Sequence, residues 1–396
     1  MIRQLLNFIL FYVVMLAYSL GYSQESGKNK TDYLRSSLYL DLISLEEAFG
    51  DEIPKILNDL PFPDKYNNHN NQDTESSSFL NMMQTYVRIG TGAEVDIDKI
   101  FQNYIDESNL ENKLIAIWFN RQRDGTFNME TVAERGFYDA SQLEADLAGQ
   151  TLRGRAALAD AGENLIQNTF VVLGLMYVNG NHKKFAIGSN VRLYRLNWDK
   201  EKAAQFYKDY WIPKGSFNLE KRRAFEDMNL FDLEYIGSQS HTEVIKVSRR
   251  DPILELPDRR YFSARLPRQI ENRKRFKTIV TRHFDEVYAN LQKKHPVFRV
   301  LTPLSSVNPL SAQIGMKEGL KGGEKFEVLE QSMNKETGQI ILKRKGTITV
   351  ATGKVWDNRY NAGEQQADGA LQNEDYTLFK GSSNKYASGM LIRQIN

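Results

Sequence analysis

The chain of 396 residues contains no cysteine, which excludes disulfide bonds and a lipid attached through a cysteine. The fold must therefore be held together by burial of apolar side chains and by hydrogen bonds. Exported animal proteins commonly rely on disulfides, so an exported chain of this composition fits a bacterial envelope better.

Histidine is scarce as well, and none of the five histidines lies three or four residues from another. That is the spacing at which one helix face holds a metal, so the sequence predicts no metal site and no cofactor. His283 falls within the apolar stripe of a predicted helix and is expected at a helix interface, whereas His182 and His241 fall in predicted turns. None is expected to be catalytic, because none has an evident partner.

The motifs of common hydrolases are absent or incomplete. No Gly-x-Ser-x-Gly elbow occurs, and the Ser-x-x-Lys match at 382–385 lacks the Ser-Asp-Asn and Lys-Thr-Gly elements of its class. Carboxylates are dense at 44–52 and 96–107, and glycoside hydrolysis needs two carboxyl groups across a cleft. Both groups are expected on solvated helix faces, yet they keep a hydrolase as the alternative function.

Neither sign of charge dominates the chain. The formal net charge is +2, so there is no global field that would attract nucleic acid. With 41% hydrophobic and 11% aromatic residues the chain can bury a core, and its length predicts two or three domains.

The longest apolar run lies at the N-terminus, where Arg3 precedes an apolar stretch at 5–20. This run is short for a membrane-spanning helix, which needs about 20 apolar residues. The small residues of Gly-Tyr-Ser at 21–23 suit a signal peptidase, so residues 1–23 are predicted to be a secretory signal peptide, with an uncleaved anchor as the alternative. We therefore expect an exported protein, located in the periplasm or associated with the outer membrane.

Helical periodicity dominates residues 24–125, which we interpret as an N-terminal helical region. Apolar residues at three- and four-residue spacing predict a helix over 33–49, and two more helices are expected at about 79–88 and 97–119. A long polar loop at 66–78 separates the first helix from the others.

Residues 126–300 mix helices with strands and are expected to form a small sheet covered by helices. A nearly all-apolar run at 169–177 predicts a strand buried on both faces, which returns through a turn at 179–181 to a strand at 190–198. The other elements expected here are a helix at 152–168, a helix over 200–211 capped by Asp199, a hairpin of 231–236 and 242–248 around Gly237, and a helix over 270–294.

From Leu301 onward, short alternating segments separated by turn residues replace the helical periodicity. Several short strands at such spacing predict a small, SH3-like β-barrel over 301–396. The expected fold class is therefore α+β: an N-terminal helical region, central helices packed on a small sheet, and a C-terminal barrel.

Three glycines within this barrel, Gly319, Gly322 and Gly323, raise the question of a phosphate loop. A Walker-type loop needs Gly-Lys-Ser/Thr followed by a helix, and the sequence at 318–331 supplies neither. The residues after the glycines alternate with period two, which predicts a strand. The glycines are expected to adopt positive φ angles in a tight turn that leads into it.

The same stretch contains the pattern Gly-Leu-x-x-Gly-Glu-x-Phe-x-Val, formed by Gly319, Leu320, Gly323, Glu324, Phe326 and Val328. It resembles the small carboxy-terminal barrel of flagellar assembly protein T and of related curli-export-type envelope proteins, where aspartate often replaces the glutamate. The resemblance is confined to the C-terminal part of the chain, and its residues are structural. It implies a periplasmic or outer-membrane-associated assembly or scaffold protein rather than an enzyme, without implying a flagellum.

The most basic segment is 249–277, which contains ten Lys or Arg residues against four Asp or Glu residues, and three prolines. Such a segment suits anionic material, which outside the cytoplasm means lipid head groups, lipopolysaccharide or an acidic glycan. The alternative is a proline-bent connection with an ordinary solvated surface. The predicted binding residues are Arg249, Arg250, Arg259, Arg260, Tyr261, Arg265 and Arg268.

These observations favour a non-enzymatic, exported bacterial envelope protein that acts as a binding or scaffold component. Its expected partner is an envelope protein or an anionic surface, not nucleic acid, and a homo-oligomer is left open. The alternative is a hydrolase of envelope polysaccharide or peptidoglycan that uses paired carboxylates. A third hypothesis is a small-ligand binding module seated between the central sheet and the barrel.

Overall fold

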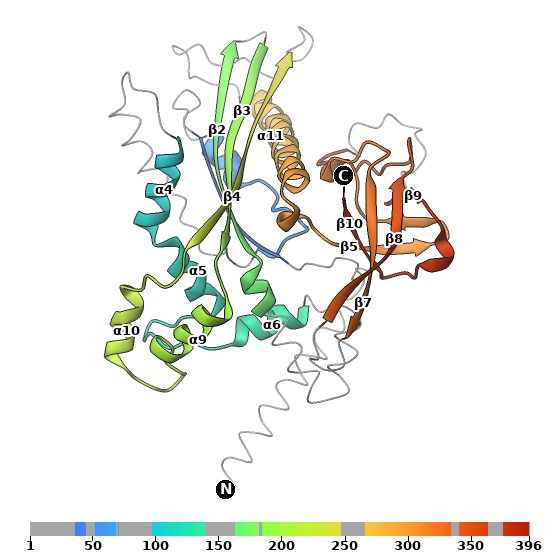
Figure 1. Ribbon diagram of the computed structural model, residues 1–396. Helices are drawn as coiled ribbons and strands as arrows, with labels where there is room; N and C mark the ends of the chain where they lie inside the picture. Colours follow the sequence, from blue (N-terminus) through green and yellow to red (C-terminus); the bar gives the residue numbers. More distant parts are fainter. Residues whose placement is uncertain are drawn as a thin grey trace. The chain divides into compact units, whose positions relative to one another are not determined.

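The computed structural model has an α+β fold, in which a four-stranded sheet with helices is followed by a closed β-barrel (Figure 1). The structure describes residues 36–44, 52–68, 70, 97–138, 163–181, 184–246, 266–333, 340–362 and 375–395. The predicted signal peptide at 1–23 and the predicted helix at 79–88 lie outside these ranges. Within them, no helix is both long enough and apolar enough to cross a membrane.

The sheet has the strand order β1-β2-β3-β4. β1 (Ser37–Ser44) lies parallel to β2 (Thr169–Asn181), whereas β2, β3 (Lys184–Leu196) and β4 (Leu233–Lys246) are antiparallel neighbours. The central position of β2 leaves its consecutive apolar side chains buried on both faces. This confirms the buried strand predicted at 169–177.

Helices cover both faces of the sheet, as Figure 1 shows. α2 (Glu52–Asn58) and α11 (Leu266–Lys294) pack on one face, and α4 (Ile97–Ser108) packs on the other together with α5 (Leu110–Trp118). Successive side chains of a strand point to opposite faces, so β1 and β2 each contribute to two separate cores. The first core contains Leu38, Phe170, Val172, Val280 and Phe284, and the second contains Tyr39, Val171, Leu173, Phe101 and Leu114.

Three helix predictions are confirmed within the described ranges. The segment predicted as one helix over 97–119 is helical, but Asn109, with a left-handed φ of 47°, separates α4 from α5. Asp199 caps α9 (Lys200–Asp209) as expected, because its carboxylate accepts hydrogen bonds from two backbone amides of the first turn. The last predicted helix matches α11, which ends directly before His295.

The predicted helix over 33–49 is wrong for residues 37–44, which form β1. Leu38 and Leu42 are four residues apart, and this spacing fits one face of a strand as well as one face of a helix. Because the strand has a core on each side, Tyr39 on its second face is also buried. The apolar residues therefore fail to alternate clearly with polar ones, which removes the usual signal for a strand.

The hairpin predicted around Gly237 is also wrong, because β4 continues through this residue as one strand. The pairing with β3 shifts its register at Gly237, where one extra residue forms a β-bulge. A Cβ atom on Gly237 would lie 2.2 Å from the imidazole Cε1 of His295, so the glycine permits a close approach rather than a turn. His241 consequently lies within a strand, and β2 likewise continues through the turn predicted at 179–181.

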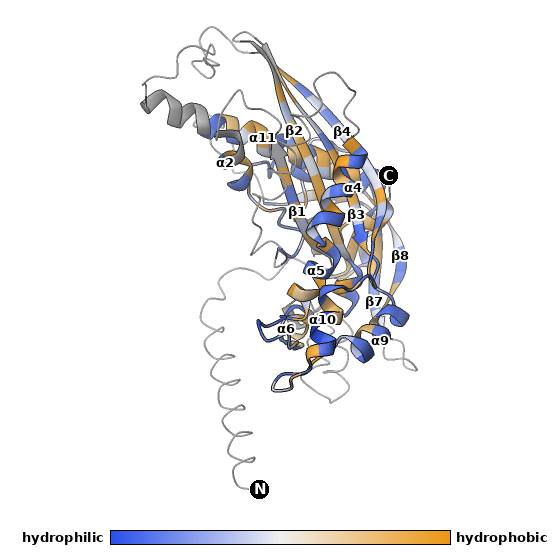
Figure 2. Ribbon diagram, turned by 90° about the vertical axis from the view of Figure 1, so that its left-hand side faces the viewer, coloured by the Kyte–Doolittle hydropathy of each residue, from blue (hydrophilic) through white to orange (hydrophobic). Residues whose placement is uncertain are grey.

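An aromatic cluster occupies the end of the sheet where α6 (Glu130–Tyr138), α9 and α10 (Leu219–Glu226) gather. Phe206 of α9 is fully buried at its centre and stacks on Phe119, with ring centroids 5.0 Å apart. The outward residues of α9 and α10 are mostly hydrophilic (Figure 2). This helical end is therefore built around its own core.

Six strands close into a barrel in the order β10-β5-β6-β9-β8-β7, which confirms that the C-terminal part of the chain forms a β-barrel. Phe326 and Val328 point into the barrel, as their alternation predicts, and pack with Ile348 and Ile392. The strands are β5 (Thr302–Val307), β6 (Leu310–Ala312), β7 (Lys325–Met333), β8 (Ile340–Val350), β9 (Thr377–Lys380) and β10 (Leu391–Gln394).

The glycine-rich stretch is a turn, as predicted. Gly319, Gly322 and Gly323 have φ angles of 77°, 111° and 96°, and strand β7 follows them rather than a helix. The amides of Lys321 and Gly322 donate hydrogen bonds to the carboxylate of Glu324, at 2.8 and 2.9 Å. A side chain of the protein itself thus accepts the amide bonds that an anion would accept in a phosphate loop.

We expect Glu324→Ala to lower the free energy of unfolding by about 1–2 kcal/mol, because two charge-assisted hydrogen bonds in the turn are lost. Urea denaturation measures the effect. Lys321→Ala is the matched control, since it removes an exposed side chain and keeps the backbone amide. Equal stability of the two variants would show that the carboxylate does not hold the turn.

Candidate functional site

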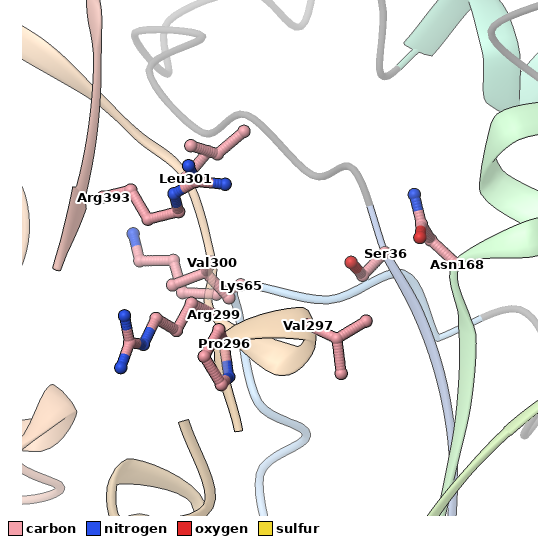
Figure 3. Close-up of a pocket in the computed structure, with 9 residues that line it drawn as sticks. All are labelled: Ser36, Lys65, Asn168, Pro296, Val297, Arg299, Val300, Leu301 and Arg393. Atoms are coloured by element: carbon pink, nitrogen blue, oxygen red, sulfur yellow. The ribbon is translucent and has the colours of Figure 1, made fainter. Parts of the chain in front are cut away.

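A pocket of about 200 Å³ lies between the sheet and the barrel, and we call it the cationic pocket (Figure 3). Three cationic side chains lie on one side of it, and two small polar residues at the starts of β1 and β2 lie on the other. Apolar residues of the segment that joins α11 to the barrel form the rest. The lining residues are Ser36, Lys65, Asn168, Pro296, Val297, Arg299, Val300, Leu301 and Arg393.

A buried aromatic residue holds the connecting segment at 296–301 in place. η2 (Pro296–Phe298) ends on Phe298, whose ring centroid lies 5.0 Å from that of Tyr66 and 5.0 Å from that of Phe170. The hydroxyl of Tyr66 also donates a hydrogen bond of 3.1 Å to the carbonyl of Phe298. The wall of the cationic pocket is therefore anchored in the core of the sheet.

Arg299 is fixed by backbone carbonyls rather than by a carboxylate. Its guanidinium donates to the carbonyls of Gln292 and Lys293 at the end of α11, and to the carbonyl of Gln394 in β10, at 3.0–3.1 Å. A cation at a helix C-terminus is favoured by the helix dipole. Arg299 thus joins α11 to the barrel and keeps its positive charge beside the pocket.

The other two cations each contact the barrel. Arg393 donates to the carboxylate of Glu327 at 2.8 and 2.6 Å, which makes it an ion pair. Lys65 donates to the carbonyl of Gln313 in the barrel at 3.2 Å. No carboxylate belongs to the pocket lining itself, and Glu327, which balances Arg393, lies outside it.

The cationic pocket suits a small anionic group such as a carboxylate or a phosphate. Arg and Lys donors bind both groups by charge-assisted hydrogen bonds. Its volume is below the roughly 300 Å³ at which pockets for drug-sized ligands begin, so one group of a larger partner fits better than a whole polymer chain. Val297, whose side chain is 40% exposed, supplies an apolar contact at the rim.

Carboxylates converge in a second, much smaller cavity beside α11, which we call the acidic cavity. Its volume is about 20 Å³, enough for a single water molecule. Asp285 of α11, Glu318 of η3 (Met316–Glu318) and Asp64 line it, together with Lys317. Lys317 forms an ion pair with Asp64 at 3.0 Å.

Burial raises the pKa of Asp285 to about 7, with Lys317 opposing the shift and the nearby carboxylates of Glu318 and Asp64 adding to it. One oxygen of Asp285 and one of Glu318 are buried without a hydrogen-bond partner among the described residues. The other oxygen of Glu318 accepts from the amide of Gly315 at 2.7 Å. Asp285 therefore has the electrostatics of a general acid, within a space too small for a sugar ring.

Two further buried polar groups lie at the faces of the sheet, one on α11 and one on β1. His283 lies at the interface of α11 with β3, as predicted, bonded to Ser189 at 2.9 Å, and burial lowers its pKa to about 3. Asp41 in β1 accepts from the hydroxyl of Tyr104 at 2.8 Å, and burial raises its pKa to about 6. Asp41 was missed by the sequence analysis, although a carboxylate inside the apolar run at 37–43 was a visible signal.

The predicted basic binding segment cannot be compared with either pocket. Arg249, Arg250, Arg259, Arg260, Tyr261 and Arg265 lie outside the described residues, and Arg268 is described only as a backbone position in the first turn of α11. The structure instead brings together Lys65, Arg299 and Arg393, which the sequence analysis did not select. No local motif marks them, because they are far apart in the chain.

Comparisons with known proteins add no assignment, since no protein-family model matches the chain and no curated protein matches it. The described ranges also contain no group of three or more His, Asp or Glu side chains placed to hold a metal ion.

The pKa of Asp285 predicts how stability depends on pH. The folded state holds this proton up to a pH of about 7, whereas the unfolded carboxyl releases it near 3.8, so stability falls as the pH rises between these values, by as much as about 4 kcal/mol. We expect Asp285→Asn to lose this decline and to be the more stable form above pH 7. Urea denaturation of both proteins from pH 4 to 8 measures the free energy of unfolding at each pH.

Glu107→Gln is the matched control for this substitution, because it neutralises an exposed carboxylate on another helix, α4. A wild-type decline that persists unchanged in Asp285→Asn would show that the cavity does not hold the proton.

Proposed function

We propose that this chain is a non-enzymatic binding or scaffold component of a bacterial envelope, and that its cationic pocket holds an anionic group of its partner. The observation that carries the proposal is the set of three cationic side chains around a cavity with no carboxylate in its lining. The partner is an envelope protein or an anionic surface, such as lipid head groups, lipopolysaccharide or an acidic glycan.

The contacts that fix the walls of the cationic pocket favour a role in binding over a role in catalysis. Arg299 is held by three backbone carbonyls and the connecting segment is anchored by Phe298, so the donors are ordered before a ligand arrives. Preorganised donors improve affinity because less conformational entropy is lost on binding. The N-terminal signal pattern and the resemblance of the barrel to envelope assembly proteins support the location and the scaffold role.

A hydrolase of envelope polymer is the second candidate, and the acidic cavity is the observation that favours it. Asp285, with its raised pKa, and Glu318 converge there as an acid and a base would. Glycoside hydrolysis needs room for a sugar and a water between its carboxyl groups. The volume of about 20 Å³ has room for one water molecule but not for a sugar ring, so we rank this function second.

The proposed binding role is tested with a photocrosslinking amino acid at Val297, on the rim of the cationic pocket. In cells that export the protein, we expect a discrete crosslinked product, because a bound partner must contact this rim. Lys65→Glu reverses one charge of the pocket and should reduce the product about tenfold. Lys65→Arg keeps the charge and is the matched control.

A product of equal yield in all three proteins would show that the charge of the pocket has no part in binding. The hydrolase is tested separately, by release of soluble fragments from purified peptidoglycan and envelope polysaccharide. Turnover that is lost in both Asp285→Asn and Glu318→Gln, and kept in Glu107→Gln, would replace the binding role with the second candidate.

A further inference from the structure

The loop between α9 and α10 projects from the helical end of the sheet. Residues 213–220, which include this loop and the start of α10, are all exposed. In Figure 1 the loop lies at the end of the molecule formed by α6, α9 and α10. Eight consecutive exposed residues form a surface that no described residue covers.

The tip of this loop is apolar. Phe217 has 74% of its surface exposed, the largest value among the exposed large hydrophobic side chains of the described residues, and Leu219 has 44% exposed. An isolated exposed leucine is common in proteins and needs no explanation. Phe217 in the loop and Leu219 at the first position of α10 are two residues apart and form a small apolar point instead.

The sequence around this point is rich in cations. Residues 208–223 contain Lys208, Lys214, Lys221, Arg222 and Arg223 against two carboxylates, Asp209 and Glu220, and Arg222 also lies 3.8 Å from Glu226. The ammonium of Lys221 donates to the backbone carbonyls of Lys208 and Trp211, so no carboxylate neutralises it there. Lys214 lies 3.9 Å from Glu130, and both side chains are exposed, so that ion pair is weak.

The loop is held in this conformation by the aromatic cluster beneath it. Trp211 stacks on Phe127 with ring centroids 5.5 Å apart, and the buried Ile212 accepts a hydrogen bond from the amide of Phe127 at 2.8 Å. On the other side, Asn218 caps α10 by accepting from the amide of Lys221 at 2.9 Å. Phe217 is therefore presented to solvent by ordered backbone on both sides.

We propose that the loop between α9 and α10 docks onto a membrane surface of anionic phospholipid, with Phe217 and Leu219 entering the boundary between head groups and acyl chains. The flanking lysines and arginines bind the phosphates of the head groups. Apolar side chains at a tip, ringed by cations, are the combination by which proteins lie on a membrane without spanning it.

The shape of the surface favours a bilayer over a protein partner. A stable protein interface buries roughly 1,200 Å² or more and has a broad apolar centre, whereas two side chains on a narrow tip offer far less. A bilayer accepts such a tip because the lipids rearrange around it. This surface shares no residue with the cationic pocket, so the inference goes beyond the proposed function and does not depend on it.

The experiment is flotation of the full chain with phosphatidylcholine vesicles that contain or lack phosphatidylglycerol. We expect binding to the anionic vesicles and little to the neutral ones. Phe217→Ser with Leu219→Ser should weaken binding about tenfold or more, because the apolar anchor is lost. Lys214→Glu should weaken it about fivefold or more and lower its salt sensitivity, because fewer cations then contact the head groups.

Ile341→Ser with Leu342→Ser is the matched control, since these adjacent residues of β8 are also exposed, at 48% and 40%. Their loss should leave vesicle binding unchanged. All substituted side chains of the loop are exposed, and circular dichroism checks that each variant folds.

The inference would be overturned by equal binding to neutral and anionic vesicles, by unchanged binding of the Phe217 and Leu219 variant, or by loss of binding in the β8 control. Binding to soluble heparin that is lost with Lys214→Glu while vesicles are not bound would assign the loop to a soluble polyanion instead. Loss of vesicle binding in Lys65→Glu alone would move the anionic contact to the pocket.

Discussion

The burial of strand β2 on both faces is the constraint on which the other elements depend. A strand with apolar side chains on both sides needs a covering layer on each face, and α11 and α4 provide these layers. Because α11 is 29 residues long, it carries the chain along the sheet and ends near the start of β1 and β2. The position of the barrel follows from where this helix ends.

The junction between α11 and the barrel is made mainly by polar groups. Arg299 joins the helix end to β10, Arg282 donates to the carbonyl of Tyr360, and Lys293 donates to the carbonyl of Gly319. A Cβ atom on Gly319 would lie 3.0 Å from the Cβ of Ala289, so this glycine also allows the barrel turn to approach the helix. Carbonyl acceptors leave the charge of Arg299 unneutralised, which is why a cationic pocket exists at this place.

Two chemically different spaces lie side by side at this junction, and Lys65 lines both. The larger has cations and the room for an anionic group, whereas the smaller has carboxylates and the room for a water. This difference in volume is the reason why we propose binding at the larger space and a structural role for the protonated carboxyl in the smaller one. The exposed loop at Phe217 is a second, separate surface, and its proposed ligand is also anionic.

The sequence alone determined the features that depend on a few neighbouring residues: the cap at Asp199, the end of α11 before His295, the glycine turn at 319–323, and the alternating strands of the barrel. Only the tertiary structure decided that 37–44 is a strand and that β4 runs through Gly237, because burial on two faces and a bulge depend on distant partners. It also decided the cationic pocket, since Lys65 and Arg393 meet through packing and no local backbone preference encodes a contact across more than three hundred residues.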